Sequence, residues 1–515
     1  MRGWDKARSK ARIDNFIAKV PRLTAVQTFD VDAFERRRVT VLASRGATLD
    51  ASIDPIFDLP TTAAIVVHGV HVYAQLIDFS QQMRDLKMET VAGHERLLTM
   101  LHLHYAACDA VAVEFEAQRV DYHGPRMHAV IVTPVGPENE RERIRRALQF
   151  ANALQRTIEE IGRSVGAGQY SSRVRIGLDS GMAVAINSGR GSERDPLFLG
   201  SPANHAAKLA EGDIPGIFVS GRIRSSLGMP ALESVDAEKA SVLHLATARA
   251  LFSRAVEADD TLVANSVERV KSRTFPGGSL PTFSFHHHEP PLDSIKFDDL
   301  VPSNAIRMEL LSIFGDVSGF TAYVDECIAG QRIPEMVRNF HVIRSELAAS
   351  LREDFNGRKI RYIGDCIHGV IAKGDARSTD VRGSIESAVA AAAGLRSSFD
   401  LCRTVLGTPS NLGIAFGIEF GATPISRIGI RGDRSVRCCV GKSVSESEGL
   451  QSDCDGRETR IGPRALLQAP TSIRRIFDLS GLVTGLDYAS YLAYTAAPVI
   501  VSSGSVSREA RPYLR

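Results

Sequence analysis

Two aspartates in the second half of the chain stand where they could bind metal ions. Asp316 follows the apolar residues IFG and precedes the turn SGFT, and Asp365 lies at the turn of KIRYIGDC. Both acids are expected at a strand end beside a glycine. Carboxylates from adjacent strands can share a pair of divalent ions, which activate an attacking oxygen and stabilise a leaving phosphate. Either aspartate alone is equally compatible with ordinary turn capping, so the prediction depends on the pair.

The turn after Asp316 adds a second kind of site. Its residues are Ser318, Gly319, Phe320 and Thr321. We expect a helix to begin there, and the backbone N–H groups at a helix start bind anions. A metal pair beside an anion site indicates a nucleoside triphosphate bound with two divalent cations, Mn²⁺ or Mg²⁺.

The chain carries an internal repeat. The segment VDYHGPRMHAVI at 120–131 aligns without a gap on IRYIGDCIHGVI at 360–371. At the same offset, RIGLDSG at 175–181 aligns on AFGIEFG at 415–421. Two matches at one offset indicate two homologous domains.

The first copy lacks both acids. At the position of Asp316 it reads Gly69 or its neighbour His68, and at the position of Asp365 it reads Pro125. None of these residues is an acid. We therefore expect one metal site, in the second copy.

Each copy has the same expected order of elements. An apolar strand at 63–67 or 311–315 precedes a helix, and a strand pair follows with the turn GPR or GDC at its tip. Apolar residues at spacings of three and four predict helices over 144–158 and 336–351. Strands alternating with helices predict an α/β sandwich fold. The expected parts are an N-terminal helical or irregular segment at 1–58, a degenerate domain at 59–235, a linker at 236–300, the domain with the metal acids at 301–470 and a C-terminal extension at 471–515.

Composition limits the partners and the compartment. The 515 residues carry a formal net charge of +2 with interspersed signs, which argues against a nucleic-acid partner. Seven cysteines without a C-x-x-C pair favour a reducing compartment. The basic start lacks the apolar stretch of a signal peptide, and the longest apolar run is too short to span a bilayer. We expect a cytoplasmic protein without a membrane span, and leave a homodimer open.

These motifs resemble those of the class III nucleotidyl cyclases, the family of adenylate and guanylate cyclases. FGDVSGFT looks like the family's first metal motif, KIRYIGDC like its second, and IGIR like the stretch that brings an arginine onto the triphosphate. The resemblance implies two tandem class III cyclase-like, ferredoxin-like domains that form an intramolecular pseudo-dimer. It also implies metal binding by Asp316, Val317 and Asp365, and a triphosphate contact from Arg431.

The first copy resembles the half of the family's site that holds the base and the ribose. Its GSPANHAAKL is similar to the family's GNTVNxxxR run, with Asn204 on the ribose-orienting asparagine and Lys208 on the arginine that neutralises the transition state. The second copy has Ser445 and Gly449 there, so the resemblance implies one complete site and one inactive site. A lysine lacks the planar fork of arginine, and Lys208 is also compatible with a plain surface residue.

Base selection is expected to depend on Asp121 and its neighbour Tyr122. Asp121 aligns with Arg361 and stands where adenylate cyclases carry a lysine and guanylate cyclases a glutamate. A carboxylate only accepts hydrogen bonds, so it requires a donor on the base and disfavours adenine. Leu197 and Phe198 fall near the family's second base-reading position and add bulk that shrinks the pocket. A solvent-facing Asp121 is the competing interpretation.

The degenerate pattern looks like the bacterial Pycsar pyrimidine cyclases, which make cyclic UMP or cyclic CMP as an antiphage signal. The resemblance implies UTP or CTP as substrate, attack of the ribose 3′-OH on the α-phosphate, and an effector gated by the cyclic product. UTP is preferred because a carboxylate suits an imide N–H. Guanylate cyclase activity, and a nucleotide-binding regulator with weak catalysis, are the alternatives.

Overall fold

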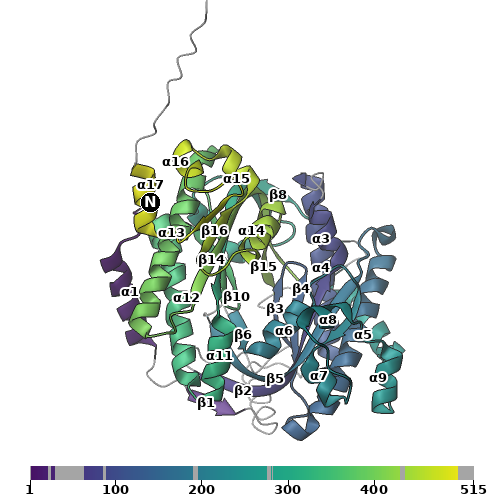
Figure 1. Cartoon of the computed structure of the whole chain (residues 1–515). Helices are drawn as coiled ribbons and strands as arrows, with labels where there is room; N and C mark the ends of the chain where they lie inside the picture. Colours follow the sequence, from purple (N-terminus) through teal and green to yellow (C-terminus); the bar gives the residue numbers. More distant parts are fainter. Residues whose placement is uncertain are drawn as a thin grey trace, which may run out of the picture.

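The computed structural model describes residues 2–20, 25–28, 63–84, 89–188, 195–274, 280, 282–429 and 435–496. These residues form two α/β halves, each built on one main sheet (Figure 1). Helices α12 and α13 lie over the sheet of the second half, and α4 and α5 lie over the sheet of the first. The expected α/β fold class with two repeated domains is confirmed.

The first half has the strand order β3-β4-β2-β5-β6, with β7 also paired to β5. Its elements are β2 (Ala63–Leu76), α3 (Ile77–Arg84), α4 (Val91–Glu114), β3 (Gln118–His123), β4 (Arg126–Ile131), α5 (Glu140–Ser164), β5 (Val174–Ser188), β6 (Asp195–Leu199), α6 (Ser201–Leu209), β7 (Gly216–Val219) and α7 (Gly221–Ser226). The expected helix over 144–158 is confirmed as α5, whose apolar side chains at those spacings are buried.

The second half repeats this layout with the order β10-β11-β9-β14-β16-β17, and β15 also pairs with β14. Its elements are β9 (Ala305–Ser318), α11 (Phe320–Ala329), α12 (Ile333–Phe355), β10 (Arg358–Ile363), β11 (Cys366–Ile371), α13 (Val381–Leu406), β14 (Gly413–Ile428), β15 (Val436–Cys439), α14 (Lys442–Ser452), β16 (Glu458–Ile461) and α15 (Pro463–Gln468). The expected helix over 336–351 is confirmed as α12.

The connector and the C-terminal extension are both structured. Among its described residues, the connector contains the α-helices α8 (Val235–Ala240), α9 (Leu245–Phe252) and α10 (Asp260–Thr274), and the short strand β8 (Phe285–His287), which pairs with β9. The extension contains α16 (Thr471–Arg474), β17 (Leu482–Thr484) and α17 (Tyr488–Ala496). Because β17 pairs with β16, the extension enlarges the sheet of the second half.

Each half completes the hydrophobic core of the other. Val184 and Ile186 on β5 belong to the core cluster of the second half. In return, Ile428 and Cys438, on β14 and β15, belong to the core cluster of the first half. Burial of apolar surface is the main favourable term in folding, so this exchange holds the halves together as a pseudo-dimer within one chain.

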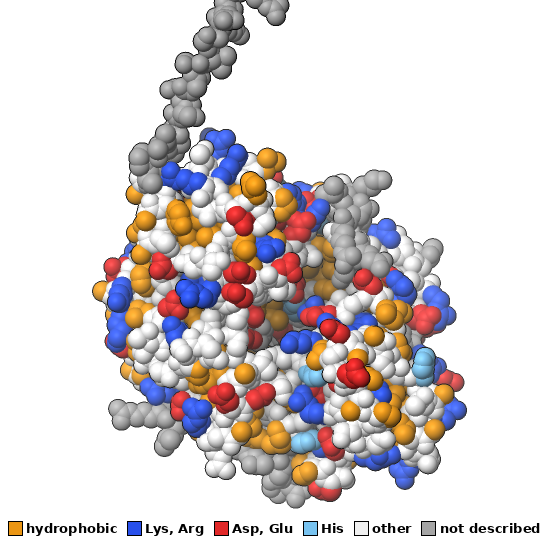
Figure 2. Space-filling model, in the orientation of Figure 1, with side chains coloured by type: hydrophobic (Ala, Val, Ile, Leu, Met, Phe, Trp, Pro, Cys, Tyr) orange, Lys and Arg blue, Asp and Glu red, His pale blue; other side chains and the backbone are white. Residues whose placement is uncertain are grey.

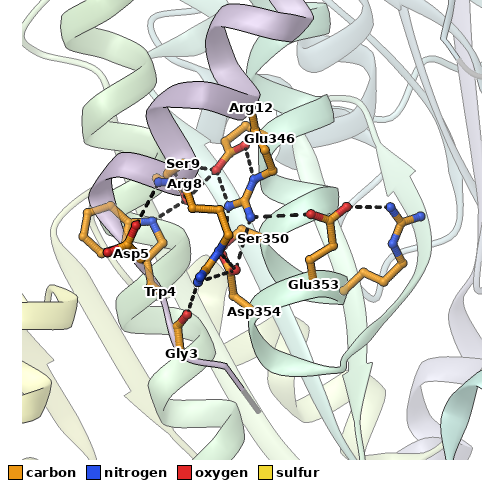
Figure 3. Close-up of polar contacts among 12 residues, drawn as sticks. Gly3, Trp4, Asp5, Arg8, Ser9, Arg12, Glu346, Ser350, Glu353 and Asp354 are labelled. Atoms are coloured by element: carbon orange, nitrogen blue, oxygen red, sulfur yellow. Dashed lines mark hydrogen bonds and ion pairs between the residues drawn. The ribbon is translucent and has the colours of Figure 1, made fainter.

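The N-terminal helix α1 (Lys6–Lys19) binds the second half through buried charges. Arg12 lies 2.7 Å from Glu346 and 2.8 Å from Asp354, and both carboxylates are fully buried on α12 (Figure 3). Arg8 adds a hydrogen bond of 2.9 Å to Asp354. A buried carboxylate is stable only when it is paired and hydrogen-bonded, so α1 is an integral part of the second half.

None of the helices among the described residues combines the length and the apolar character that crossing a membrane requires.

Candidate active site

The two metal acids lie on adjacent strands of the second half. Asp316 is near the end of β9, and Asp365 is in the turn between β10 and β11. Strand β11 is hydrogen-bonded beside β9, with Ile367 opposite Gly315. This register brings the two aspartates next to each other, as the sequence predicts.

Burial disfavours the charged form of both carboxylates. Burial raises the pKa of Asp316 to about 6. Burial and then the charge of Asp316 raise the pKa of Asp365 well above its ordinary value, although Arg344 acts in the opposite direction. A pair of crowded carboxylates is a fitting ligand set for divalent cations, which relieve the repulsion.

Further oxygen ligands would have to join the two aspartates around a cation. In the described part of the chain, no three His, Cys, Asp or Glu side chains gather in a way that could hold a metal. Val317 has a buried apolar side chain and could contribute only its backbone carbonyl oxygen. Magnesium and manganese commonly keep water and substrate phosphate oxygens as ligands, so two protein carboxylates suffice.

The strand register corrects the expected position of the first copy's counterpart to Asp316. In the second half Asp316 pairs with Ala415, which aligns on Arg175 of the first half. Arg175 pairs with Gln75, not with Gly69 or His68. The prediction of Gly69 or His68 is therefore wrong, because β2 continues to Leu76 instead of ending at residue 67.

The counterpart of Asp365 is Pro125, as expected. The turns between β3 and β4 and between β10 and β11 begin at Gly124 and Gly364, whose φ angles of +49° and +60° favour glycine. Pro125 and Asp365 follow these glycines directly. The first half therefore carries a glutamine and a proline where the second half carries its two acids.

The positions of the first half that correspond to Asp316 and Asp365 are surrounded by polar contacts. Arg126 donates a hydrogen bond of 2.8 Å to the Gln75 side chain. His123 lies 3.0 Å from Glu448 of α14. Burial alone would raise the pKa of Glu448, but the nearby His123, Arg126 and His368 lower it to about 2. Side chains of this chain thus satisfy each other where the active half would bind cations.

The expected phosphate-binding turn does begin a helix. Ser318 ends β9, Gly319 has a φ of +81°, and α11 begins at Phe320 without a side-chain cap. The Phe320 ring is buried and stacks on Phe340 at 5.0 Å between centroids. The Phe320 side chain thus belongs to the core, and only its backbone N–H could contact a phosphate.

Asn204 of the first half reaches this turn. Its side-chain amide donates a hydrogen bond to the Thr321 hydroxyl of α11. Lys208 lies one turn further along α6, and both side chains are exposed. The structure thus brings the ribose-side helix of the first half to the start of the helix that follows Asp316.

Asp121 lies between the halves and is bound to its own counterpart. The Arg361 guanidinium donates hydrogen bonds to the Asp121 carboxylate and to the Tyr122 carbonyl oxygen. The backbone N–H of Tyr122 also donates to Asp121, at 2.7 Å. The contact arises because the pseudo-twofold axis brings equivalent residues of the two β-hairpins together. Asp121 is therefore ion-paired but still partly exposed, with 30% of its side chain accessible, and its contact with a base stays a prediction.

The side chains of Tyr122 and Leu197 are buried in the protein interior. The Tyr122 side chain is fully buried, and its hydroxyl lies 2.9 Å from the Tyr105 carbonyl oxygen and 3.0 Å from Asp109. Leu197 belongs to the core cluster of the second half. These contacts explain their burial without a bound base, and their direct contact with substrate stays a prediction.

Phe198 and Tyr73 belong to one aromatic cluster. Phe198 contacts His71 and His128 edge to face, with centroids 5.3 Å and 6.4 Å apart. Tyr73 stacks on His128 at 4.2 Å, as its counterpart Phe314 stacks on His368 at 4.2 Å. The first half thus has a tyrosine hydroxyl where the second half has none.

Sequence reasoning missed Tyr73. Burial raises its pKa, and the charges of Asp121 and Asp365 raise it further, although Arg126 acts in the opposite direction. The Tyr73 ring stacks on His128 of the neighbouring strand β4, with 4.2 Å between centroids. The repeat could have revealed the residue, because Tyr73 aligns with Phe314 once Gln75 is aligned with Asp316.

Sequence reasoning also missed Arg344. Its guanidinium lies over the Tyr362 ring at 3.9 Å, and its charge acts on Asp365. Arg344 on α12 corresponds to Tyr105 on α4. The Tyr362 hydroxyl donates a hydrogen bond to the Arg344 carbonyl oxygen, as the Tyr122 hydroxyl does to the Tyr105 carbonyl oxygen. Arg431 lies outside the described residues, so its contact with the triphosphate stays a prediction.

Figure 2 shows a hollow between the two halves, with side chains of both charges around it. One half contributes a pair of adjacent buried aspartates, and the other contributes an asparagine-bearing helix. Together with the repeated α/β fold, this division defines the class of the protein as a class III nucleotidyl cyclase.

Comparisons with known proteins agree with this class. The chain is 54% identical over 520 residues to a protein of a Rhizobium species named uridylate cyclase, with 99% of both chains covered. It is 33% identical over 494 residues to a Pseudomonas aeruginosa protein of the same name, with 95% of this chain and 90% of the relative covered. No protein-family model matches the chain.

A solved structure shares the architecture of the whole chain. The crystal structure of a class III adenylyl cyclase-like ATP-binding protein from Pseudomonas aeruginosa superposes with a TM-score of 0.83 at 32% identity, over 96% of this chain and 100% of the other. The chain belongs to the family of the uridylate cyclases.

Proposed function

We propose that the chain converts UTP into 3′,5′-cyclic UMP and diphosphate, with CTP as the next-best substrate. The observation that carries this proposal is the contact of Asn204, from the first half, with Thr321, five residues after Asp316 in the second half. A single crevice can thereby hold a metal-bound triphosphate and its ribose. Two relatives that match nearly the full chain carry the name uridylate cyclase, which supports the choice of nucleotide.

Asp316 and Asp365 would hold two divalent cations, Mn²⁺ or Mg²⁺, with Val317 contributing its carbonyl oxygen. Such cations lower the pKa of a bound hydroxyl and neutralise phosphate charge. The backbone N–H groups at the start of α11 would bind a phosphate oxygen, because a helix N-terminus favours anions. Arg431 would bind the β- and γ-phosphates.

The first half would align the ribose for attack. The 3′-hydroxyl gives up its proton to solvent and its oxygen forms a bond to the α-phosphorus. The bond from that phosphorus to the bridging oxygen of the β-phosphate breaks, and diphosphate leaves. Asn204 would hold the ribose, so that the 3′-oxygen lies in line with the leaving group. Lys208 would stabilise the negative charge that develops on the α-phosphate.

The surroundings of Asp121 favour uracil. Its pair with Arg361 presents guanidinium donors beside a carboxylate acceptor. This pattern complements uracil, which has an N3–H donor flanked by carbonyl oxygens, whereas cytosine has an acceptor at N3. The Tyr73 ring, together with Phe198, which also contacts His128, would add bulk that favours a single-ring base over a purine.

The substrate preference can be tested directly. Purified protein is incubated with each of the four nucleoside triphosphates and Mn²⁺, and the products are identified by mass spectrometry. We expect cyclic UMP as the main product and cyclic CMP as the second. Cyclic GMP as the main product would instead support the guanylate cyclase alternative.

A nucleotide-binding regulator with weak catalysis is the second candidate function. The structural neighbour is described as an ATP-binding protein, which favours binding of a purine nucleotide without a stated reaction. In the same assay a regulator would give no cyclic product from any substrate. ATP would still raise its melting temperature, because a ligand stabilises the folded state that binds it.

The cyclic pyrimidine nucleotide would act as a second messenger. The resemblance to the Pycsar cyclases supports an antiphage role and an effector protein that is gated by the product. Cells that carry the chain with its effector should survive phage exposure, and cells with the Asp316→Ala variant should not. Equal survival with the variant would contradict this role.

A further inference from the structure

Helices α6 and α11 contact each other across the boundary between the halves, through the first turn of α6 and the first two turns of α11. The backbone N–H of Ser201 donates a hydrogen bond of 3.0 Å to the Asp325 carboxylate. The second contact joins Asn204 to Thr321. The residues of the two contacts are three apart on α6 and four apart on α11, about one helical turn on each.

Asp325 replaces a cap that α6 lacks. The residue before α6 is Gly200, which has no side chain to accept a hydrogen bond from the first turn. A carboxylate at a helix N-terminus satisfies an otherwise unpaired N–H and interacts favourably with the helix dipole. Here that carboxylate comes from the half that also carries the metal acids.

An ion pair between the exposed Arg222 and the buried Asp179 reinforces the contact. Arg222 donates a hydrogen bond of 3.1 Å to the Ser201 hydroxyl and one of 3.0 Å to Asp179, which is fully buried. Burial lowers the pKa of Arg222, but Asp179 raises it, and Asp325 raises it further. The charge of Asp325 thus contributes to the network that holds the first residue of α6.

We propose that Asp325 is a positioning residue for the cyclase reaction. Helix α11 begins four residues after Asp316, so the metal acid, α11, Asp325 and α6 are connected along a short path. Asp325 fixes α6 so that Asn204 and Lys208 face the bound triphosphate. This inference rests on the proposed function, because it concerns the alignment of the same site.

The pseudo-twofold counterpart of this network supplies a matched control. Arg464, the second residue of α15, corresponds to Arg222, the second residue of α7. Arg464 crosses the boundary to Glu89 of the first half, at 2.6 Å, and also binds Glu446, at 3.0 Å. Removing Glu89 therefore disturbs a similar bridge between the halves, next to the site without metal acids.

The test compares kcat, KM for UTP and melting temperature in the presence of Mn²⁺. Asp325→Ala should lower kcat by at least tenfold, because a small misalignment of reacting groups is costly, with little change in the Mn²⁺ concentration required. Asp325→Asn should recover most of kcat, since its amide oxygen still accepts the Ser201 N–H. Glu89→Ala should change the melting temperature as much as Asp325→Ala does, but keep kcat within about twofold of the wild type.

A second pair of variants tests the same contact if Asp325→Ala does not fold. Ser201→Pro removes the N–H at the first helical position, where proline is tolerated, and should lower kcat like Asp325→Ala. Ser201→Ala keeps that N–H and should retain most of kcat. Unchanged kcat in Asp325→Ala or Ser201→Pro, or an equal loss in Glu89→Ala, would overturn the inference. Full activity of Asn204→Ala would instead refute the proposed site.

Discussion

Replacing Asp316 by asparagine should stabilise the metal-free protein while abolishing its activity. The Asp316 carboxyl has a pKa of about 6 in the folded chain, against an ordinary value of 3.8, chiefly because of burial. Between these pH values the unfolded chain releases a proton that the folded chain retains, so stability falls as the pH rises through this window. Above pH 6 the Asp316 carboxyl is charged in the folded and the unfolded chain, and its burial lowers the stability by the full amount.

The size of the effect follows from the gap between the two pKa values. A difference of one in pKa is worth 1.36 kcal/mol, so the gap corresponds to about 3 kcal/mol. Asparagine carries no charge and avoids this cost at neutral pH. With an unfolding entropy of about 2.1 cal/mol/K per residue, a protein of this length should gain about 3 °C in melting temperature.

The assay is thermal unfolding of the wild type and Asp316→Asn at pH 4 and pH 7.5, with and without Mn²⁺. Without metal, the variant should melt higher than the wild type at pH 7.5, and the advantage should shrink at pH 4. Mn²⁺ should stabilise the wild type but not the variant. Asp299→Asn, at an exposed acid, should change little. A variant that melts lower than the wild type at pH 7.5, or gains from Mn²⁺ equally, would refute the reasoning.

Three further outcomes follow from the structure. Arg12→Ala should lower the free energy of unfolding by about 3–5 kcal/mol in urea titrations, because it leaves two buried carboxylates without their main partner, whereas Lys10→Ala should cost less than about 1 kcal/mol. Tyr73→Ala should raise turnover of GTP relative to UTP in competition assays, and an unchanged ratio would exclude the ring from the base pocket. Lys208→Ala should lower kcat by at least about a hundredfold, and unchanged turnover would identify Lys208 as a surface residue.

The sequence predicted that Asp316 and Asp365 lie close together, because short motifs determine their local geometry. Asp316 and Asp365 each adjoin a glycine at a strand end, and pairing of β9 with β11 was enough to bring them together. The repeat likewise predicted two homologous domains. Both are properties of segments of about ten residues, in which neighbouring side chains decide the conformation.

The length of a strand was harder to predict. Residues 63–67 are apolar, but β2 continues to Leu76, through alternating polar and apolar residues that pair with β4 and β5 on both sides. Pairing with two neighbours, a tertiary effect, decided where the strand ends. Because the strand was expected to end at residue 67, the counterpart of Asp316 was placed at Gly69 or His68, and Tyr73 was not considered as a site residue.

The partner of Asp121 could not be predicted from one copy alone. Arg361 occupies the equivalent hairpin position 240 residues later, and the two meet only because the halves associate about a pseudo-twofold axis. Asp121 and Arg361 carry opposite charges at aligned positions of the repeat. Such a pair is a signal for contact across a pseudo-twofold axis. The contacts of Phe320 and Tyr122 also depend on packing, since both side chains are buried in cores.

The most direct test of a single active crevice compares the two register-equivalent positions of the halves. Cyclic UMP production from UTP and Mn²⁺ is measured for the wild type, Asp316→Ala and Gln75→Ala. The structure predicts no product from Asp316→Ala and nearly full activity from Gln75→Ala. Undiminished product from Asp316→Ala, or an equal loss in both variants, would contradict it.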